Sequence, residues 1–405
     1  MPSSILLVAH AFKPSQEPGA QRPWRFYRYL PAYGYLPLVL TASAQDPARP
    51  NEGVRHTATD PQPLYSLEGF LDRFLTRYFM MAELGDWRWV REATATAAEL
   101  HGRTPFTIVL SSFPPLAVHQ VAMQLKRKLG VKWVADFRDP LGGNPYRRTT
   151  AFHGWVDSYL ERRVFKHADA LIANTDVVLE DWKKRFPQYS DKMHLIWNGY
   201  DPEDRIAALP LPVRTRRVLG HIGSSYGDRH PGLLIESLQR LTTSGQLASD
   251  SVQLLLQGTI GGTFERYAGL RQELKERGVL VENNFLIPKQ EAQRLLGEVD
   301  SLVLLDTPGE RPSQVPAKIF EYMQIGRPIL AITAEGSPVD RLLDESGIPN
   351  VRLHYGSSEA EIDTRLLAFL KLPTEPVHMA ESFAAKFDGN LQTRQLARIL
   401  DQISA

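Results

Sequence analysis

Residues Val315-Pro316-Ala317-Lys318-Ile319-Phe320-Glu321-Tyr322-Met323 decide the fold, because they stand between two short apolar runs, 301–306 and 329–332. Such runs predict buried strands, and the stretch between them predicts a short helix ended by Gly326. A strand, helix and strand in this order predict a parallel α/β sheet. Ligands of such sheets bind at the carboxyl ends of the strands, where this helix begins.

The start of this helix carries groups that suit a nucleotide. Free N–H groups at a helix N-terminus attract anions. Lys318, in the first turn, can reach a phosphate, and Glu321, one turn on, can accept hydrogen bonds from ribose hydroxyls. The pair therefore predicts a nucleotide site. The alternative is a capped helix whose Lys and Glu side chains lie in water.

Composition is typical of a soluble globular protein of two or three domains. The 405 residues are 43% apolar and 23% charged, with a net charge of +1. No run approaches the roughly 20 apolar residues of a transmembrane helix, and residues 1–10 lack the basic start of a signal peptide. The absence of cysteine excludes disulfides, thiolate nucleophiles and Cys-ligated zinc. We therefore expect a cytoplasmic protein that binds no nucleic acid.

Charge is divided unevenly along the chain. Residues 1–200 hold 25 Lys and Arg against 19 Asp and Glu, a net charge of +6, and residues 201–405 hold the remaining 22 and 27, a net charge of −5. Within the basic half, Phe70, Phe74 and Tyr78 recur at four-residue spacing in an expected helix. This pattern suits core packing or an interfacial helix on an anionic membrane. Peripheral attachment to the inner face of the cell membrane is thus one expectation, and a solvated basic surface is the other.

Strand and helix patterns alternate twice, with a Pro- and Arg-rich linker at 203–216 between the two series. We predict two doubly wound Rossmann-like domains that face a central cleft, residues 1–205 and 206–389, with a final helix at 390–405 that packs back on the first domain. In the first domain, Asp136, Arg138 and Asp139 follow a buried strand. Charges are seldom buried unless paired, so they predict either a site or a structural Asp–Arg pair.

Several motifs, in their order and spacing, resemble retaining nucleotide-sugar-dependent glycosyltransferases of family 4, which have the GT-B fold. The resemblance covers nearly the whole chain. The motifs are Gly19 in the first loop, Ala135-Asp136-Phe137-Arg138-Asp139-Pro140, Ala168-Asp169-Ala170-Leu171-Ile172-Ala173-Asn174-Thr175, Asn198-Gly199-Tyr200-Asp201, His221-Ile222-Gly223-Ser224 and the Val315–Met323 stretch quoted above.

The resemblance implies that the first domain binds the acceptor and that the second binds the nucleotide sugar, with Glu321 on the ribose. It also implies retention at the anomeric carbon without a metal ion or other cofactor. Donor-side candidates are Gly19, Ser224, Ser225, Arg229, His230, Ile287, Lys318 and Glu321; catalytic candidates are Arg138, Asp136, Asp139 and Lys318; acceptor-side candidates are Arg22 and His119.

Two positions depart from the family pattern. Ser313 stands where the wider family has a second glutamate, eight residues before Glu321, and Arg138 stands where many members have a histidine. A guanidinium can bind phosphate but cannot act as a base.

The predicted function is therefore transfer of a hexosyl or N-acetylhexosaminyl group from a nucleotide sugar to a glycan or lipid-linked acceptor, in bacterial cell-surface polysaccharide or glycoconjugate synthesis. The alternatives are a nucleotide-sugar epimerase of the same fold and a non-catalytic nucleotide-sugar-binding protein.

Overall fold

The computed structural model describes residues 2–15, 17–43, 54–57, 87–142, 151–309 and 313–405. Residues Phe70, Phe74 and Tyr78 of the expected interfacial helix lie outside this part of the chain. The described residues divide into two compact units, Met1–Asp201 with Lys386–Ala405, and Pro202–Ala385.

The first unit is built on a parallel sheet of seven strands. Their order is β3 (Val54–His56), β2 (Tyr35–Thr41), β1 (Ser3–Ala9), β4 (Ile108–Phe113), β5 (Lys132–Phe137), β6 (Ala170–Ala173) and β7 (Met193–Leu195). The helices are α1 (Gln21–Tyr29), α3 (Trp87–Arg103), α4 (Ala117–Leu129), α5 (Ala151–His167), α6 (Asp176–Arg185) and α14 (Gly389–Ser404).

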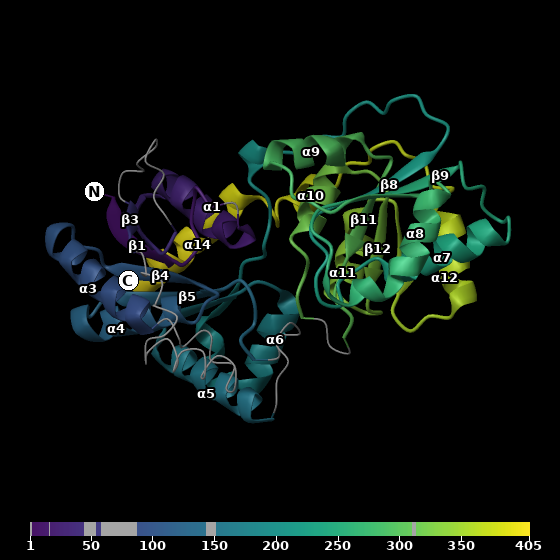
Figure 1. Cartoon of the computed structure of the whole chain (residues 1–405). Helices are drawn as coiled ribbons and strands as arrows, with labels where there is room; N and C mark the ends of the chain where they lie inside the picture. The colour runs from purple at the N-terminus through teal and green to yellow at the C-terminus, as the bar shows by residue number, and fades with distance from the viewer. Residues whose placement is uncertain (1, 16, 44–53, 58–86, 143–150, 310–312) are drawn as a thin grey trace, which may run out of the picture. The chain divides into compact units, whose positions relative to one another are not determined.

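Side chains of β1 alternate between two apolar layers, as the period of a strand requires. Leu6 and Val8 belong to the layer formed with α3, α4, α5 and α6. Ile5 and Leu7 belong to the layer on the other face, which holds Phe26 of α1 and apolar residues of α14. Figure 1 shows α1 and α14 side by side. The sheet is therefore covered on both faces, which explains why its strands are apolar runs.

Helix α14 completes the first unit although it lies at the far end of the chain. Its N-terminus is joined to the segment that leaves the unit, since Tyr200 N–H donates to Phe387 O and Gly389 N–H donates to Tyr200 O, both at 3.0 Å. Farther along, Tyr35 Oη donates to Asp401 at 2.6 Å. The chain thus leaves the unit and re-enters it at adjacent points.

The second unit contains a parallel sheet of six strands. Their order is β10 (Leu280–Asn283), β9 (Val252–Gln257), β8 (Arg217–Ile222), β11 (Ser301–Leu305), β12 (Ile329–Thr333) and β13 (Asn350–His354). The helices are α7 (Gly232–Thr243), α8 (Ala268–Glu276), α9 (Lys289–Glu298), α10 (Lys318–Ile325), α11 (Pro338–Ser346), α12 (Glu359–Phe369) and the short α13 (Glu381–Ala384).

Both sheets reverse their strand order beside the first strand, at β1/β4 and at β8/β11. Such reversals are where ligands bind in open α/β sheets, outside the carboxyl ends of the strands. The predicted fold class, two doubly wound Rossmann-like α/β domains, is confirmed. The predicted central cleft concerns the placement of the two domains and stays a prediction. Among the described helices, none combines the length and the apolar character needed to cross a membrane.

Candidate functional site

Two loops at the carboxyl edge of the second sheet pack together through glycines. A Cβ on Gly258, after β9, would lie 2.5 Å from Gly223 O, after β8, and a Cβ on Gly262 would lie 2.5 Å from Gly227 N. The loops are also hydrogen-bonded, because Ser225 N–H donates to Thr259 O at 2.9 Å. Only glycines allow this approach, which fixes the β8 loop beside the start of α10.

Lys318, the first residue of α10, reaches back under the β8 loop. Its Nζ donates to Ile222 O at the end of β8. A Cβ on Gly223 would lie 2.3 Å from Lys318 Cε and 2.5 Å from Nζ, so the glycine makes room for the ammonium group. Burial lowers the pKa of Lys318, and the charge of Arg229 lowers it further. An anion at this edge would stabilise the ammonium form.

Arg229 brings a second cation to the same edge. Its Nε donates to Leu305 O, the last residue of β11, at 2.8 Å. This bond holds the β8 loop against the strand at the topological switch point. Ser224 lies on the outer side of the loop, where its Oγ accepts a hydrogen bond from Thr259 Oγ1 at 2.6 Å.

Glu321 lies one turn after Lys318 and is partly buried. Its charge raises the pKa of Lys318, which places the two side chains within electrostatic reach. Within the described part of the chain, no hydrogen bond or ion pair to the Glu321 carboxylate is found. The carboxylate is thus available to accept hydrogen bonds from a ligand. Ser313, the position of the missing glutamate, is partly buried in the loop before α10.

Two further donor-side candidates lie in other surroundings. His230 is buried in a stack on Phe264, with ring centroids 5.4 Å apart, and its Nδ1 accepts from Gly232 N–H at 3.1 Å. Burial lowers its pKa. Ile287 is partly buried in the segment after β10, which Gln257 holds through a 2.7 Å hydrogen bond to Phe285 O. The buried His230 ring thus packs on Phe264 at the end of the loop after β8, whereas Ile287 follows β10, which is an edge strand of the sheet.

Asp306 and His221 were not predicted as site residues. Asp306 follows β11 and is buried, and this burial raises the pKa of its carboxyl to about 6, although Thr333 Oγ1 donates to it at 2.8 Å. His221 lies in β8, where burial lowers its pKa to about 3 and Val303 O lies 2.9 Å from Nδ1. The charge next to a strand end was the available signal for Asp306, and the His221-Ile222-Gly223-Ser224 motif was the available signal for His221.

In the first unit, the predicted catalytic Asp136 and the predicted acceptor-side Arg22 form one buried ion pair. Arg22 Nε and a terminal nitrogen donate to the carboxylate at 2.7–3.0 Å, and Ser112 Oγ donates to it at 2.8 Å. The other terminal nitrogen of Arg22 donates to Trp197 O at 2.6 Å. Both side chains are almost wholly buried. The pair joins α1 to β5 in the protein without ligand.

Arg138 uses its guanidinium to hold loops together. It donates to Phe113 O at 3.0 Å, to Pro114 O at 2.7 Å and to Gly19 O. A Cβ on Gly19 would lie 2.6 Å from the guanidinium, which explains the glycine. Asp139 is partly buried, and its charge raises the pKa of Arg138 against the lowering caused by burial. Arg138 thus positions the loops after β4 and β5 and the loop before α1.

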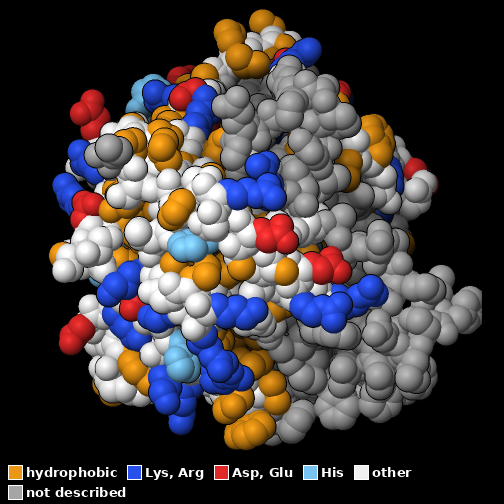
Figure 2. Space-filling view, turned by 90° about the vertical axis from the view of Figure 1, so that its left-hand side faces the viewer, with side chains coloured by type: hydrophobic (Ala, Val, Ile, Leu, Met, Phe, Trp, Pro, Cys, Tyr) orange, Lys and Arg blue, Asp and Glu red, His pale blue; other side chains and the backbone are white. Residues whose placement is uncertain are grey.

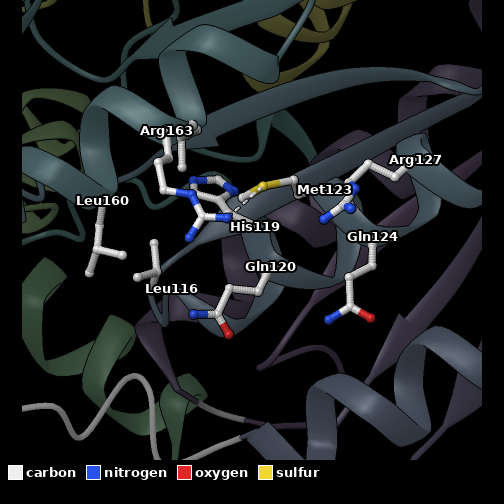
Figure 3. Close-up of a pocket in the computed structure, with 9 residues that line it drawn as sticks. Leu116, His119, Gln120, Met123, Gln124, Arg127, Leu160 and Arg163 are labelled. Atoms are coloured by element: carbon white, nitrogen blue, oxygen red, sulfur yellow. Dashed lines mark hydrogen bonds between the residues drawn. The ribbon is translucent and has the colours of Figure 1, made fainter.

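His119 lies inside the first unit, between α4 and the sheet. Its ring stacks on Phe113 and lies 4.6 Å from Phe137, measured between centroids. Burial lowers its pKa to about 3, so the imidazole is neutral. Its Nδ1 lies 2.8 Å from Ser111 Oγ, and its ring lines a cavity between α4 and α5 (Figure 3). The charge of Arg138 also lowers the pKa of His119, but no hydrogen bond between the two side chains is found among the described residues.

No group of three or more His, Cys, Asp or Glu side chains that could hold a metal ion occurs among the described residues. At one sheet edge the second unit instead combines two cations, Lys318 and Arg229, with the Glu321 carboxylate, which has no hydrogen-bond or ion-pair partner among the described residues. This combination can bind an anion that carries neighbouring hydroxyl groups.

Comparison with known proteins gives the same architecture. Residues 20–204 match the family model described as Glycosyltransferase Family 4. No curated protein matches. Among solved structures, the chain is similar to sucrose-phosphate synthase from Thermosynechococcus elongatus, at 15% identity, 99% coverage of both chains and a TM-score of 0.67.

Two further solved structures show the same likeness. The catalytic domain of starch synthase IV from Arabidopsis thaliana, bound to ADP and acarbose, is similar at 10% identity, with 100% of this chain and 99% of that chain covered and a TM-score of 0.60. WaaG, a glycosyltransferase involved in lipopolysaccharide biosynthesis, is similar at 15% identity, with 98% and 95% covered and a TM-score of 0.57. At these identities the likeness establishes the GT-B fold.

Proposed function

We propose that the protein is a glycosyltransferase that moves a sugar from a nucleotide-sugar donor to a glycan or lipid-linked acceptor with retention of anomeric configuration. One observation carries the proposal. Lys318 and Arg229 bring two cations to the carboxyl edge of β8 and β11, while Glu321 stands beside them without a hydrogen bond or ion pair in the described part of the chain. The family-model match over residues 20–204 supports the same class of enzyme.

The donor's diphosphate would take the place of backbone carbonyls as the partner of these cations. Lys318 Nζ now donates to Ile222 O, and the approach of two cations costs electrostatic energy that an anion would offset. The ribose hydroxyls would donate to Glu321. In this arrangement the nucleobase of the donor would extend toward the segment after β10, where Ile287 lies.

Transfer breaks the bond between the anomeric carbon and the diphosphate oxygen, which leaves with the electron pair. The acceptor oxygen forms the new bond on the same face of the sugar, and its proton passes to the leaving phosphate. Negative charge grows on the diphosphate during this step, so Lys318, Arg229 and backbone N–H groups of the β8 loop would stabilise it. The step needs neither a metal ion nor a further cofactor.

In the first unit, Arg22, Asp136 and Arg138 would act by positioning the loops that receive the acceptor, because the two guanidinium groups donate to protein oxygens and the carboxylate accepts from protein donors. Asp139 stands next to them and completes the proposed acceptor side. A hexosyl or N-acetylhexosaminyl donor and a role in bacterial cell-surface glycans form part of the proposal. The similarity to a lipopolysaccharide glycosyltransferase supports that role.

The test is calorimetric titration of the protein with a panel of nucleoside diphosphates and nucleotide sugars. Glu321→Gln and Lys318→Met should each weaken binding of the preferred ligand about 10-fold or more, because each removes a charge-assisted hydrogen bond. Glu359→Gln is the matched control, since Glu359 is exposed on α12. Unchanged affinity of the two site variants for every ligand would refute the site.

Activity is tested by incubating the preferred donor with and without glycan and lipid-linked acceptors. Product that appears only with an acceptor supports the transferase. Conversion of the donor without an acceptor would identify an epimerase, and tight binding without any conversion would identify a non-catalytic binding protein.

A further inference from the structure

Helix α5 exposes two large aromatic side chains on the outer surface of the first unit. Trp155 is 65% exposed and Tyr159 is 51% exposed. Their rings stack with centroids 6.0 Å apart and planes inclined by 14°. Trp and Tyr on an exposed surface are favoured where water meets the head groups of a bilayer, because one part of each ring is apolar and another part is polar.

The same stripe of α5 is strongly basic. Arg162 and Lys166 follow Trp155 and Tyr159 at the spacing that brings residues to one face of a helix, and both are exposed. The acidic residues of α5, by contrast, point inward. Glu161 is buried in an ion pair with Arg185 at 2.5 Å, and Asp157 is also buried.

Helix α4 adds positive charge beside this stripe. It contains no acidic residue and ends in Lys126-Arg127-Lys128, of which Lys126 is paired with Asp169 at 2.5 Å, so Arg127 and Lys128 carry the added charge. Figure 2, turned by 90° from Figure 1, shows Lys and Arg side chains next to hydrophobic ones, with some Asp and Glu side chains among them. The face therefore combines exposed aromatic rings with cations, and the described acidic residues of α4 and α5 are buried.

A cavity of about 190 Å³ lies between the two helices. Leu116, Met123 and Leu160 form its apolar part. Figure 3 shows Arg163 extending from α5 toward α4, where its guanidinium lies 4.0 Å from Met123 Sδ, and Arg127 at the side of α4. The cavity thus offers cations next to an apolar surface.

His119 adds a polar group to this cavity. Trp133 Nε1 donates to Ser111 Oγ at 2.7 Å, and the Ser111 hydroxyl has two acceptors, His119 Nδ1 at 2.8 Å and Val134 O at 3.4 Å. The shorter contact favours donation from Ser111 Oγ to Nδ1, the tautomer in which the ring proton is on Nε2. That atom is buried and has no hydrogen-bond partner among the described residues. A buried donor without an acceptor costs about 1–3 kcal/mol, which a ligand oxygen would offset.

We propose that this face docks on an anionic lipid bilayer, with the phosphate of one lipid held in the α4/α5 cavity by Arg127, Arg163 and His119. The aromatic pair would lie at the level of the head groups, and the lipid chain would follow the apolar part of the cavity. The proposal goes beyond sugar transfer and rests on the first unit alone.

The experiment is co-sedimentation of the full chain with phosphatidylcholine vesicles and with vesicles of phosphatidylcholine and phosphatidylglycerol at about 7:3. Binding should require phosphatidylglycerol and weaken as salt is added. Arg162→Gln with Lys166→Gln should lower the partition coefficient about 25-fold, since each cation near the surface contributes about fivefold. Arg394→Gln with Arg398→Gln, which removes two exposed cations from α14, should change it less than about twofold.

The cavity is tested by Arg127→Gln with Arg163→Gln, which also removes two charges. This pair should lose more binding than Arg162→Gln with Lys166→Gln, because it removes the phosphate contacts as well. Equal losses in these two pairs would overturn the lipid site. Binding to neither vesicle, equal binding to both, or an equal loss in the α14 control would overturn the docking face. Affinity for the nucleotide donor, measured in parallel, should stay unchanged in all variants, which separates this proposal from the proposed function.

Discussion

Replacing Gly223 with alanine is the sharpest test of the donor site, because the new methyl group would occupy the place of the Lys318 side chain. The added Cβ would lie 2.3 Å from Cε and 2.5 Å from Nζ. These atoms are the far end of a flexible side chain, so Lys318 can move aside while the backbone stays in place. Gly223→Ala should therefore displace the ammonium group without unfolding the unit.

The expected loss of affinity follows from the contact removed. A hydrogen bond to a charged group contributes about 1.5–3 kcal/mol, which corresponds to a factor of about 10 to 150 in the dissociation constant of a nucleoside diphosphate. Backbone strain also contributes, because Gly223 has φ +150°, where side chains are disfavoured. That strain lowers the free energy of unfolding by roughly 1–3 kcal/mol.

Gly227→Ala separates the two effects. Gly227 lies in the same loop at φ +56°, but a Cβ there would meet no atom within 4 Å. Both variants should lose stability in urea unfolding, and Gly223→Ala should lose at least as much as Gly227→Ala, because φ +150° lies outside the left-handed helical region. Only Gly223→Ala should lose donor affinity in calorimetry. If the affinities of the two variants agree within twofold, Lys318 does not bind the diphosphate.

Three further predictions concern the buried groups. Arg22→Met should lower the free energy of unfolding by about 3–5 kcal/mol, because it leaves the Asp136 carboxylate buried without its cation. Adding Asp136→Leu should recover most of this loss, as measured by urea unfolding. An unchanged free energy of unfolding in the single variant would contradict the buried pair. Burial raises the pKa of Asp306 from 3.8 to about 6, so the folded state binds this proton more tightly than the unfolded state does. The stability gained from the bound proton is present below about pH 4 and is lost as the pH rises through about 6. Asp306→Asn should remove about 2 kcal/mol of pH-dependent stability when urea unfolding is compared at about pH 4 and pH 7. Parallel pH profiles of the two proteins would refute this prediction. Leu400→Ala should lower the free energy of unfolding of the first unit by about 2–5 kcal/mol, because Leu400 is buried in the apolar layer that contains Ile5 and Leu7 of β1. Donor affinity should stay unchanged. An unchanged free energy of unfolding would show that α14 does not close that layer.

The fold could be predicted from the sequence because it follows from local patterns. Short apolar runs separated by helical periodicity specify a parallel sheet covered on both faces. The position of Lys318 and Glu321 at the start of α10 was predictable for the same reason, since the Gly326 stop and the apolar spacing fix the helix. These features depend on residues that are near neighbours in the chain.

Partners from distant parts of the chain could not be predicted. Asp136 and Arg22 are 114 residues apart, and nothing local distinguishes a buried ion pair from two site residues. The sequence likewise places Asp306 at the end of a strand but does not show that its carboxyl is buried and accepts a hydrogen bond from Thr333 of β12. His119 is different, because Ala122 and Leu125 continue its buried face along α4 and could have indicated a core position.

The return of the chain into the first unit has a consequence for its biosynthesis. Residues 202–385 are inserted between two parts of one core, so the second unit can complete its six-stranded sheet while the first still lacks α14. Synthesis proceeds from the N-terminus at about 5–20 residues per second. The apolar layer of β1 that α14 covers therefore lacks this helix for tens of seconds, until α14 has been synthesised. The unit that is translated first is the last to be finished, and during that interval its open face is a natural substrate for chaperones.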